Sequence, residues 1–432
     1  MSVALLPLGV LGGAVIVVVF LTLVPAHRSR WIALVSALAL VVVFAQNSTP
    51  VLVRTLSFAA AIVMLALGEV RSSTVARGRH DVVVATVVWW GLVGMGAVIA
   101  SSYSLPRYAL EAVLIGLMVW SLSRATRTDV RMLVRAFVVL AVVQSLLAGW
   151  EVGTGAEPLW GFRGGIEREN PLVDSLVRAQ GTFGHPIVLG YYLGAAFVMA
   201  WTSSRALGAR SRLAALVVIG SGLVLSGTRS AIAASLLAIV VHVLLRRRLV
   251  PWIAGTAIIT VAALITAILD PGISEIVLHA IDSGSWIHRS ASLEAVPDLL
   301  ARNGWELWWG SGYGSEITLF DDGHIALTYG LPVVDSFLVY VLGTMGIVGL
   351  VATIALVTVA FVRGSRMVRA LVAYVAVMFF SFDTTVWLSS GVTMFMLLGL
   401  AGAAGGGAST RTSPSGASGR RKALAAANAE GV

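Results

Sequence analysis

Residues 334–362 read VDSFLVYVLGTMGIVGLVATIALVTVAFV, and Asp335 is the single charged residue among them. A helix needs about 20 apolar residues to cross the roughly 30 Å hydrocarbon core of a bilayer. The stretch exceeds that length and has almost no polar interruption. It therefore predicts a membrane-spanning helix that begins near Asp335.

Similar apolar runs fill the rest of the chain. Of its 432 residues, 58% are hydrophobic and 12% are charged, a composition that excludes an ordinary soluble domain. The runs long enough, or nearly so, to cross a bilayer are 3–24, 31–45, 51–70, 82–100, 109–122, 132–150, 186–202, 213–226, 231–245, 249–269, 334–362, 368–381 and 386–403. The sequence predicts an all-α polytopic integral membrane protein with about 12–13 transmembrane helices.

Charge and cysteine content limit the partners of the chain. The formal net charge is +9, but the basic residues form short runs between apolar segments instead of one polar face, so we expect no nucleic-acid partner. Cysteine is absent, which excludes disulfides and thiolate metal sites. The histidines are too widely spaced for a zinc pattern, and we predict no metal.

The arginines lie in alternate loops. Residues of this kind are Arg28, Arg30, Arg71, Arg77, Arg79, Arg124, Arg127, Arg131, Arg205, Arg210, Arg212, Arg246, Arg247, Arg248, Arg363, Arg366 and Arg369. Because cytoplasmic loops are enriched in Arg and Lys, this alternation predicts an external N-terminus and a cytoplasmic C-terminus. We expect a multi-pass protein of the cytoplasmic membrane whose active site faces outside.

Two long loops on the predicted outer side interrupt a membrane domain over 1–403. They cover 151–185 and 270–333 and hold most of the acidic residues. Long loops are where function is concentrated. In the second loop, SASLEAVPDLLARNGWELWW (290–309) predicts an amphipathic helix on the outer leaflet, interrupted at Pro297. The glycine-, alanine- and serine-rich segment 404–432 predicts a disordered cytoplasmic tail.

Three arginines lie on the predicted outer side, where the positive-inside rule disfavours them. Arg229 stands in the turn LSGTRSAIAAS between two apolar runs, whereas Arg178 and Arg289 lie in the long loops. Each can be an ordinary loop arginine or, for Arg229, a side chain that reaches lipid headgroups. Together they favour an anion site, because guanidinium groups and helix N-termini bind phosphate oxygens.

Several other polar residues flank the same helix ends. Asp335 and His324 are candidates for a general base, although Asp335 also occupies an N-cap position. His185, which precedes Pro186, is either a site residue or a helix-start residue. Glu111 either lines an ion path or, as we favour, pairs with Arg107 one turn earlier.

The order of these motifs resembles the O-antigen ligase and O-antigen polymerase superfamily of bacterial membrane proteins. The segments that carry the resemblance are RAQGTFGHP (178–186), SGTRSA (226–231), HRSASLEAVPDLL (288–300), WWGSGYG (308–314) and VDSFLVYVLGTMGIVGL (334–350). The resemblance covers roughly residues 130–360; the N-terminal helices are similar only in being hydrophobic.

The resemblance implies a GT-C-like helical fold and a metal-independent glycosyltransferase without a cofactor. Such proteins transfer glycan from an undecaprenyl-diphosphate donor to a glycan or lipid-glycan acceptor at the outer membrane face. By this resemblance Arg178, Arg229 and Arg289 bind the donor diphosphate, and Gly310, Gly312 and Gly314 match the family's glycine-rich segment. Asp335 and Ser336 stand where ligases carry a histidine and a small polar residue, which leans towards a polymerase.

The predicted function is therefore polymerisation or ligation of surface polysaccharide, with Asp335 or His324 as the base. The alternative is a transporter or flippase of envelope precursors, since many helices together with Glu111 and Arg229 can line a pathway. A non-catalytic scaffold in envelope synthesis is a third possibility. The concentration of polar residues in the outer loops favours the enzyme.

Overall fold

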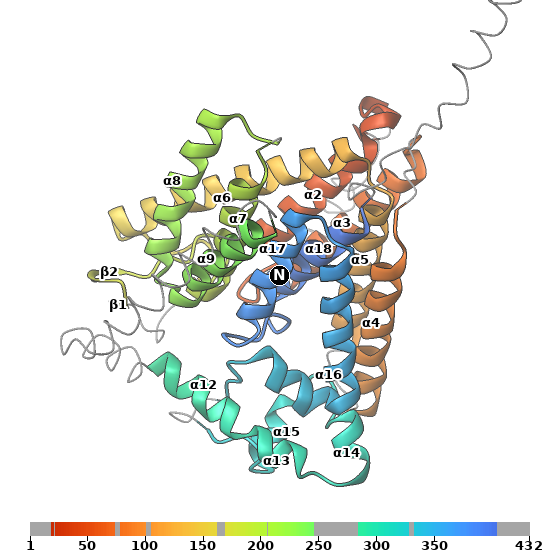
Figure 1. Ribbon diagram of the computed structural model, residues 1–432, viewed down its shortest axis with the longest axis vertical. Helices are drawn as coiled ribbons and strands as arrows, with labels where there is room; N and C mark the ends of the chain where they lie inside the picture. Colours follow the sequence, from red (N-terminus) through yellow and green to blue (C-terminus); the bar gives the residue numbers. More distant parts are fainter. Residues whose placement is uncertain are drawn as a thin grey trace, which may run out of the picture.

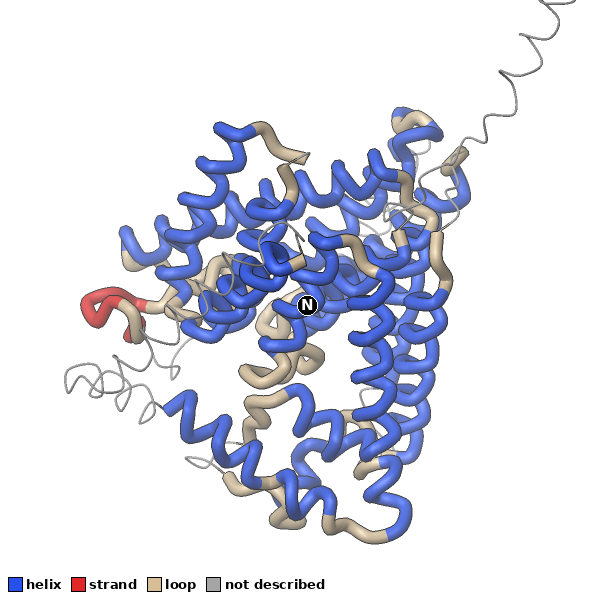
Figure 2. Tube along the Cα trace, viewed as in Figure 1, coloured by secondary structure: helices blue, strands red, loops and turns tan. Residues whose placement is uncertain are grey.

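The computed structural model describes residues 19, 20, 22–73, 78–100, 105–161, 169–204, 206–245, 284–327 and 332–403, and these form a helical bundle (Figure 1). The predicted helix at 249–269, the tail at 404–432 and most of the run at 3–24 lie outside the described residues. Figure 2 shows how strongly helix dominates. The strands β1 (Glu169–Asn170) and β2 (Val173–Val177) form a short antiparallel pair.

The apolar runs fold as predicted into helices. They are α2 (Ser29–Phe44), α3 (Val51–Arg71), α4 (Asp81–Ile99), α5 (Leu105–Ser123), α6 (Arg127–Thr154), α7 (Pro186–Thr202), α8 (Ala209–Ser226), α9 (Arg229–Leu244), α16 (Phe337–Arg363), α17 (Arg366–Met378) and α18 (Leu388–Gly399). In the described part of the chain, seven helices are long and apolar enough to cross a membrane, and α7, α9 and α18 are shorter apolar helices. The prediction of an all-α polytopic membrane protein is confirmed at this level.

The interior and the surface of the bundle are both apolar. Helix α7 is buried on almost every side, and α18 is buried along its whole length, so these two helices form the centre. On the periphery, α8 exposes Leu213 and Val217, and α3 exposes Val63. A soluble protein rarely presents such apolar helix faces to water, whereas lipid suits them.

Local signals in the sequence set where several helices begin. Thr126 and Asp129 form a reciprocal capping box at the start of α6, which satisfies two backbone N–H groups. Pro186 occupies the first turn of α7, where its missing N–H has no cost, and His185 is the N-cap. Gly227 ends α8 in a left-handed conformation, with φ of 63°, and this allows the tight turn into α9.

One end of the bundle, here called the arginine end, joins the loops that carry the alternating arginines. The backbone N–H of Arg79, between α3 and α4, donates to the carbonyl of Gly402 at 2.9 Å. Arg363 at the end of α16 pairs with Asp81 at 2.7 Å. Loops separated by hundreds of residues therefore meet on one side, as an alternating arrangement of helices requires.

A buried ionic cluster fixes the arginine end. Arg30 on α2 is 1% exposed; its Nε lies 2.7 Å and its Nη2 3.4 Å from the carboxylate of Glu69 on α3. Its Nη1 donates to the carbonyl of Arg124 at 3.0 Å and lies 4.0 Å from Asp129. Ser121 on α5 donates to Glu69 at 2.7 Å. Four helices are thus joined through one guanidinium group.

The opposite end, here called the loop end, collects the remaining connections. Asn47, after α2, donates to the carbonyl of Val386 between α17 and α18 at 2.9 Å. Thr228, at the start of α9, donates to the carbonyl of Pro186 at the start of α7 at 3.0 Å. Helices α12 (Gly284–Glu294), α13 (Val296–Leu300), α14 (Gly304–Trp309) and α15 (Glu316–Asp321) lie together beside this end, at the bottom of Figure 1. They confirm helix in the predicted amphipathic segment.

Helix α16, predicted as one continuous span, is interrupted at Gly346. This glycine has φ of 63° and ψ of −161°, and a Cβ there would lie 2.4 Å from the backbone of Trp308. The segment after α14 enters the break, where the N–H groups of Ser311 and Gly312 donate to the carbonyls of Gly343 and Thr344 at 3.1 and 2.9 Å. Prediction of an unbroken helix was therefore wrong, because a distant segment replaces its internal hydrogen bonds.

Arg302 also donates hydrogen bonds to carbonyl groups at this break. It is 5% exposed, and its Nη2 and Nη1 donate to the carbonyls of Leu342 and Gly343 at 2.9 and 3.0 Å. Its Nε donates to the carbonyl of Leu299 at 3.1 Å. Carbonyl groups freed inside an apolar bundle need such partners. The glycine-rich segment WWGSGYG thus has a clear structural role beside α16.

Candidate functional site

Arg289 is the most unusual of the three predicted arginines. It lies in α12, is half-buried, and its Nε is buried without a hydrogen-bond partner in the described structure. Burial lowers its pKa, the charge of Asp335 raises it, and the charge of Arg229 lowers it. The guanidinium group therefore lies within electrostatic range of one acid and of a second arginine, and its Nε has no hydrogen-bond partner among the described residues.

Arg229 and Arg178 both lie at the turn that joins α8 to α9. Arg229 is the first residue of α9. The Nε of Arg178 donates to the carbonyl of Ser226 at 3.1 Å, and a Cβ on Gly227 would lie 3.2 Å from Cγ of Arg178. Because Arg229 also acts electrostatically on Arg289, the loop end brings three widely separated motifs into one region.

The segment after Arg178 is held firmly on α6. Both carboxylate oxygens of Glu151 accept from the N–H of Gln180, and the same carboxylate accepts from Gly181 at 2.9 Å. Gln144 exchanges hydrogen bonds with Thr182 at 2.9 and 3.1 Å. These contacts set the path of the chain between Arg178 and His185 and so fix both at the loop end.

Asp335 is not the N-cap of α16, although its position in the sequence suggested that role. The N-cap of α16 is Ser336, so the capping interpretation of Asp335 was wrong. The backbone N–H of Asp335 donates to Oγ of Ser292 at 3.1 Å. Ser292 and Arg289 are three residues apart on α12 and therefore lie on similar faces of that helix. This bond holds the half-buried carboxyl group near Arg289.

His185 has the helix-start role that the sequence allowed. Its Nδ1 accepts from the N–H of Ile187 at 3.3 Å, and its ring lies 4.6 Å from that of Trp387. Burial lowers the pKa of His185 to about 3, and the charge of Arg178 lowers it as well. The imidazole is therefore neutral near pH 7 and a poor general base.

A cavity of about 250 Å³ lies between these elements at the loop end. Its polar and aromatic lining comprises His185, Glu316, Asp335, Tyr340, Asp383 and Trp387. His324 follows α15, is half-buried, and is not part of this lining. Of the two predicted bases, the structure therefore places Asp335, and not His324, at the cavity.

Asp383 is a cavity residue that the sequence analysis did not single out. It lies between α17 and α18 and is 5% exposed. Its Oδ1 accepts from the N–H and hydroxyl groups of Thr385 at 2.8 and 2.9 Å and from the N–H of Val386 at 3.3 Å. Its Oδ2 is buried without a partner among the described residues. The signal for it was one acid in a short gap between two apolar runs.

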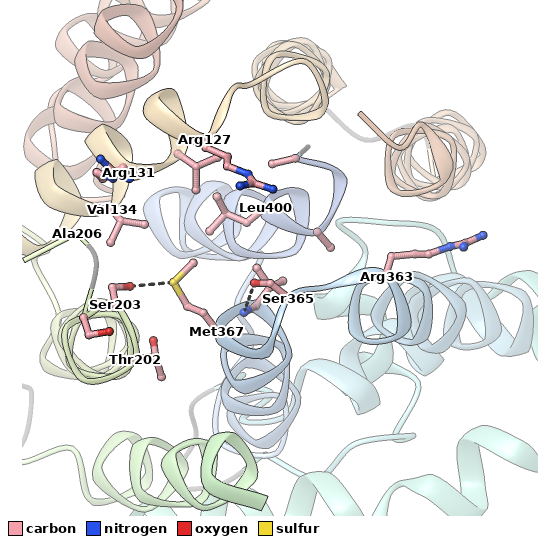
Figure 3. Close-up of a pocket in the computed structure, with 15 residues that line it drawn as sticks. Arg127, Arg131, Val134, Thr202, Ser203, Ala206, Arg363, Ser365, Met367 and Leu400 are labelled. Atoms are coloured by element: carbon pink, nitrogen blue, oxygen red, sulfur yellow. Dashed lines mark hydrogen bonds between the residues drawn. The ribbon is translucent and has the colours of Figure 1, made fainter. Parts of the chain in front are cut away.

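A second cavity, of about 340 Å³, lies at the arginine end (Figure 3). Arg127 and Arg131 line it from α6, and Ser203 donates to the sulfur of Met367 at 2.9 Å across it. Figure 3 shows Arg363 pointing away from these residues, in keeping with its ion pair to Asp81. The described lining of this cavity includes no carboxylate.

Two further predictions concern charged groups elsewhere. The expected pair of Arg107 and Glu111 is confirmed, with Nε and Oε1 2.8 Å apart. Within the described ranges, no group of three or more His, Cys, Asp or Glu residues is arranged to hold a metal ion.

Comparison with known proteins gives no assignment. No protein-family model matches the chain, and no curated protein sequence is significantly similar to it.

Proposed function

We propose that the protein is a membrane glycosyltransferase that polymerises or ligates undecaprenyl-diphosphate-linked glycan onto an acceptor hydroxyl. The loop end then faces outside the cytoplasmic membrane, in line with the positive-inside rule. The product is a surface polysaccharide or a lipid-linked glycan. The order of the motifs between 178 and 350 supports the choice of family, and the loop-end geometry supports the choice of residues.

The observation that carries this proposal is the unpaired Nε of Arg289 beside Asp335 and Arg229. A half-buried guanidinium group with an unused donor suits a phosphate oxygen, because arginine binds phosphate through two parallel hydrogen bonds. A second arginine that lowers the pKa of Arg289 makes an anion between them favourable. Arg178 contacts the end of α8, next to the turn that leads to Arg229, and so adds a third cation at this turn.

In the proposed reaction, the acceptor hydroxyl oxygen forms a bond to the anomeric carbon of the donor. The bond from that carbon to the diphosphate oxygen breaks, and both of its electrons leave with the diphosphate. Asp335 accepts the proton of the hydroxyl group. Arg289, Arg229 and Arg178 stabilise the negative charge that develops on the leaving group.

The direct test replaces Arg289 with alanine. Loss of one donor to developing charge typically costs about 10²–10³ in rate, so Arg289→Ala should abolish polymer in cells and cause lipid-linked precursor to accumulate. Arg210→Ala is the matched control, because Arg210 is exposed on α8 at the arginine end. Normal polymer from Arg289→Ala protein, present in normal amount in the membrane, would refute the assignment.

The break in α16 bears on the transporter alternative in two ways. A broken helix such as α16 is a feature of transporters, in which the freed backbone groups bind substrate or ions. Here Arg302, Ser311 and Gly312 already occupy the carbonyls of residues 342–344. The break therefore has a structural role in this bundle. Purified protein that moves lipid-linked glycan across vesicles, but transfers no sugar, would reverse the preference.

A further inference from the structure

The loop-end cavity differs in charge from the arginines beside it. Glu316 on α15, Asp335 before α16 and Asp383 between α17 and α18 contribute three carboxyl groups from separate parts of the chain. No arginine or lysine belongs to the described lining. A diphosphate is therefore favoured near Arg289 and disfavoured in the cavity, so the two regions suit different ligands.

The unpaired oxygen of Asp383 points to a hydrogen-bond donor as the missing partner. Buried carboxylate oxygens are nearly always hydrogen-bonded, because an unpaired one carries a large desolvation cost. Thr385 and Val386 saturate Oδ1 and so fix the orientation of the group. Oδ2 remains as the oxygen that can accept from a ligand in the cavity. A hydroxyl or ammonium group satisfies this requirement, and an anion does not.

The remaining walls suit a small ring with an apolar face. Trp387, Phe382 and Tyr340 line the cavity with aromatic surface, and Tyr340 lies 3.5 Å from the carboxylate of Glu316. Aromatic faces combined with a few fixed polar groups are the usual composition of small-molecule sites. The volume of about 250 Å³ lies below the roughly 300–1,000 Å³ of sites for drug-sized molecules and suits one sugar residue.

We propose that this cavity is the acceptor subsite, that it binds one uncharged or amino sugar residue through Asp383, and that it rejects acidic sugars. The inference rests on the proposed function, which makes a sugar the acceptor. Asp383 positions the sugar by accepting from one of its hydroxyl groups, while Asp335, on the side of Arg289, receives the proton of the attacking hydroxyl. The three carboxyl groups of the cavity exclude acidic sugars, because they would repel the carboxylate of such a sugar.

The experiment measures binding without any donor, so it is independent of transfer. Full-length protein in detergent is titrated at pH 8, where Asp383 is ionised, with methyl glucoside, methyl glucosaminide and methyl glucuronide, and binding is followed by saturation-transfer NMR. We expect the neutral or amino glycoside to bind at least about tenfold more tightly than the glucuronide, because the carboxylate of the glucuronide is repelled by the carboxyl groups of the described lining, which contains no arginine or lysine. This comparison uses the wild-type protein and needs no variant to fold.

A variant then assigns the preference to Asp383. Asp383→Asn keeps the shape but exchanges an acceptor for a donor, and we expect it to weaken binding of the favoured glycoside about tenfold. Asp322→Asn, at an exposed acid after α15, is the matched control and should bind as the wild type does. Equal affinity for the glucuronide, no binding of any glycoside, or unchanged binding by Asp383→Asn would overturn the inference.

The two proposals fail in different ways. Arg289→Ala protein should still bind the glycoside while it transfers nothing, because Arg289 is not part of the cavity lining. Glycoside binding with the expected preference in a wild-type protein that transfers no glycan would refute the enzyme and keep the sugar site. Transfer to acidic acceptors as readily as to neutral ones would refute the subsite and keep the enzyme.

Discussion

The two ends of the bundle use the same kinds of charged side chain in opposite ways. At the arginine end, Arg30 is almost fully buried and every part of its guanidinium group faces an acid or a carbonyl. At the loop end, Arg289 and Asp383 each keep a buried atom without a partner in the described structure. A satisfied buried charge stabilises a fold, whereas an unsatisfied one needs another explanation. Arg124 Nε at the arginine end also lacks a hydrogen-bond partner among the described residues, but it lies 3.4 Å from the carboxylate of Glu69, whereas Arg289 and Asp383 are the groups for which we propose a ligand.

The two cavities repeat this contrast. The cavity at the arginine end has exposed arginines and no acid in its described lining, whereas the one at the loop end has three acids and no arginine. Exposed cationic side chains are common in the cytoplasmic loops of membrane proteins. Buried carboxyl groups are not, so the loop-end cavity is the more informative of the two.

The largest expected effect is on stability at the arginine end. Arg30→Ala removes the nearest cation of the half-buried Glu69, which keeps Arg124 at 3.4 Å and Ser121 at 2.7 Å, and it removes the cation that faces the buried Asp129; loss of one member of a buried pair costs about 3–5 kcal/mol. Thermal unfolding in detergent should show a large loss, whereas Arg28→Ala, at an exposed neighbour, should unfold as the wild type does. Arg289→Ala should also retain most of its stability. Equal destabilisation by Arg30→Ala and Arg289→Ala would remove the distinction between the two ends.

A smaller effect is expected when Arg289 keeps its charge but loses its planar group. Lysine at this position retains one cation and lacks both the Nε donor and the two-pronged geometry that binds phosphate. We expect Arg289→Lys to reduce transfer by about ten- to a hundredfold, less than the alanine variant does, because one charged hydrogen bond is lost. Initial rates with a lipid-diphosphate donor measure this. A lysine variant as active as the wild type would show that charge alone is needed there.

A third effect concerns the dependence of stability on pH. Burial raises the pKa of Asp383 to about 7, hydrogen bonds from Thr385 and Val386 lower it, and the charge of Glu316 raises it. The other titratable groups around it are Asp335, His185, Tyr313 and Tyr340. The folded protein then keeps a proton that the unfolded chain releases at a lower pH. Stability from this group is full below about pH 4 and is lost as the pH rises through about 7.

Asp383→Asn tests this pH dependence directly. The amide does not titrate, so the unfolding temperature of the variant should fall less between pH 5 and pH 8 than that of the wild type. Asp322→Asn, at an exposed acid, should leave the wild-type slope unchanged. Identical slopes for Asp383→Asn and the wild type would show that Asp383 is not buried as described.

The smallest effect is expected in the second cavity. Arg127 and Arg131 are exposed and make no hydrogen bond or ion pair with other described residues. Single alanine variants should change the free energy of unfolding by no more than about 0.5 kcal/mol, as is usual for surface substitutions, and should leave transfer unchanged. Chemical denaturation and the transfer assay check both. A large loss of transfer would mean that the arginine end takes part in function.

The sequence predicted elements that depend on local signals. The spans follow from apolar runs, the start of α7 from His185 and Pro186, and the turn before Arg229 from Gly227. Each of these signals acts within a few residues. The alternation of arginine-bearing loops also gave the two ends of the bundle correctly, because it requires only that successive helices reverse direction.

The sequence did not predict features that depend on distant partners. Gly346 gave no signal of a break, because glycine is common in membrane helices. The break depends on contacts with the distant segment around Gly310 and with Arg302. Asp383 has local partners, but its burial comes from elements elsewhere in the chain. Pairing of Arg30 with Glu69 likewise joins two helices. None of these contacts leaves a local pattern.

The break in α16 separates two tasks that a continuous helix would combine. Phe337–Met345 is bonded to Arg302, Ser311 and Gly312 and carries Tyr340 to the cavity, while the part from Ile347 to Arg363 provides the apolar span. The described segments 302–327 and 332–345 are therefore joined to each other by hydrogen bonds at one end of the apolar span. Under the proposed function, substitutions in these segments are expected to alter the choice of acceptor without changing the length or register of the apolar span from Ile347 to Arg363.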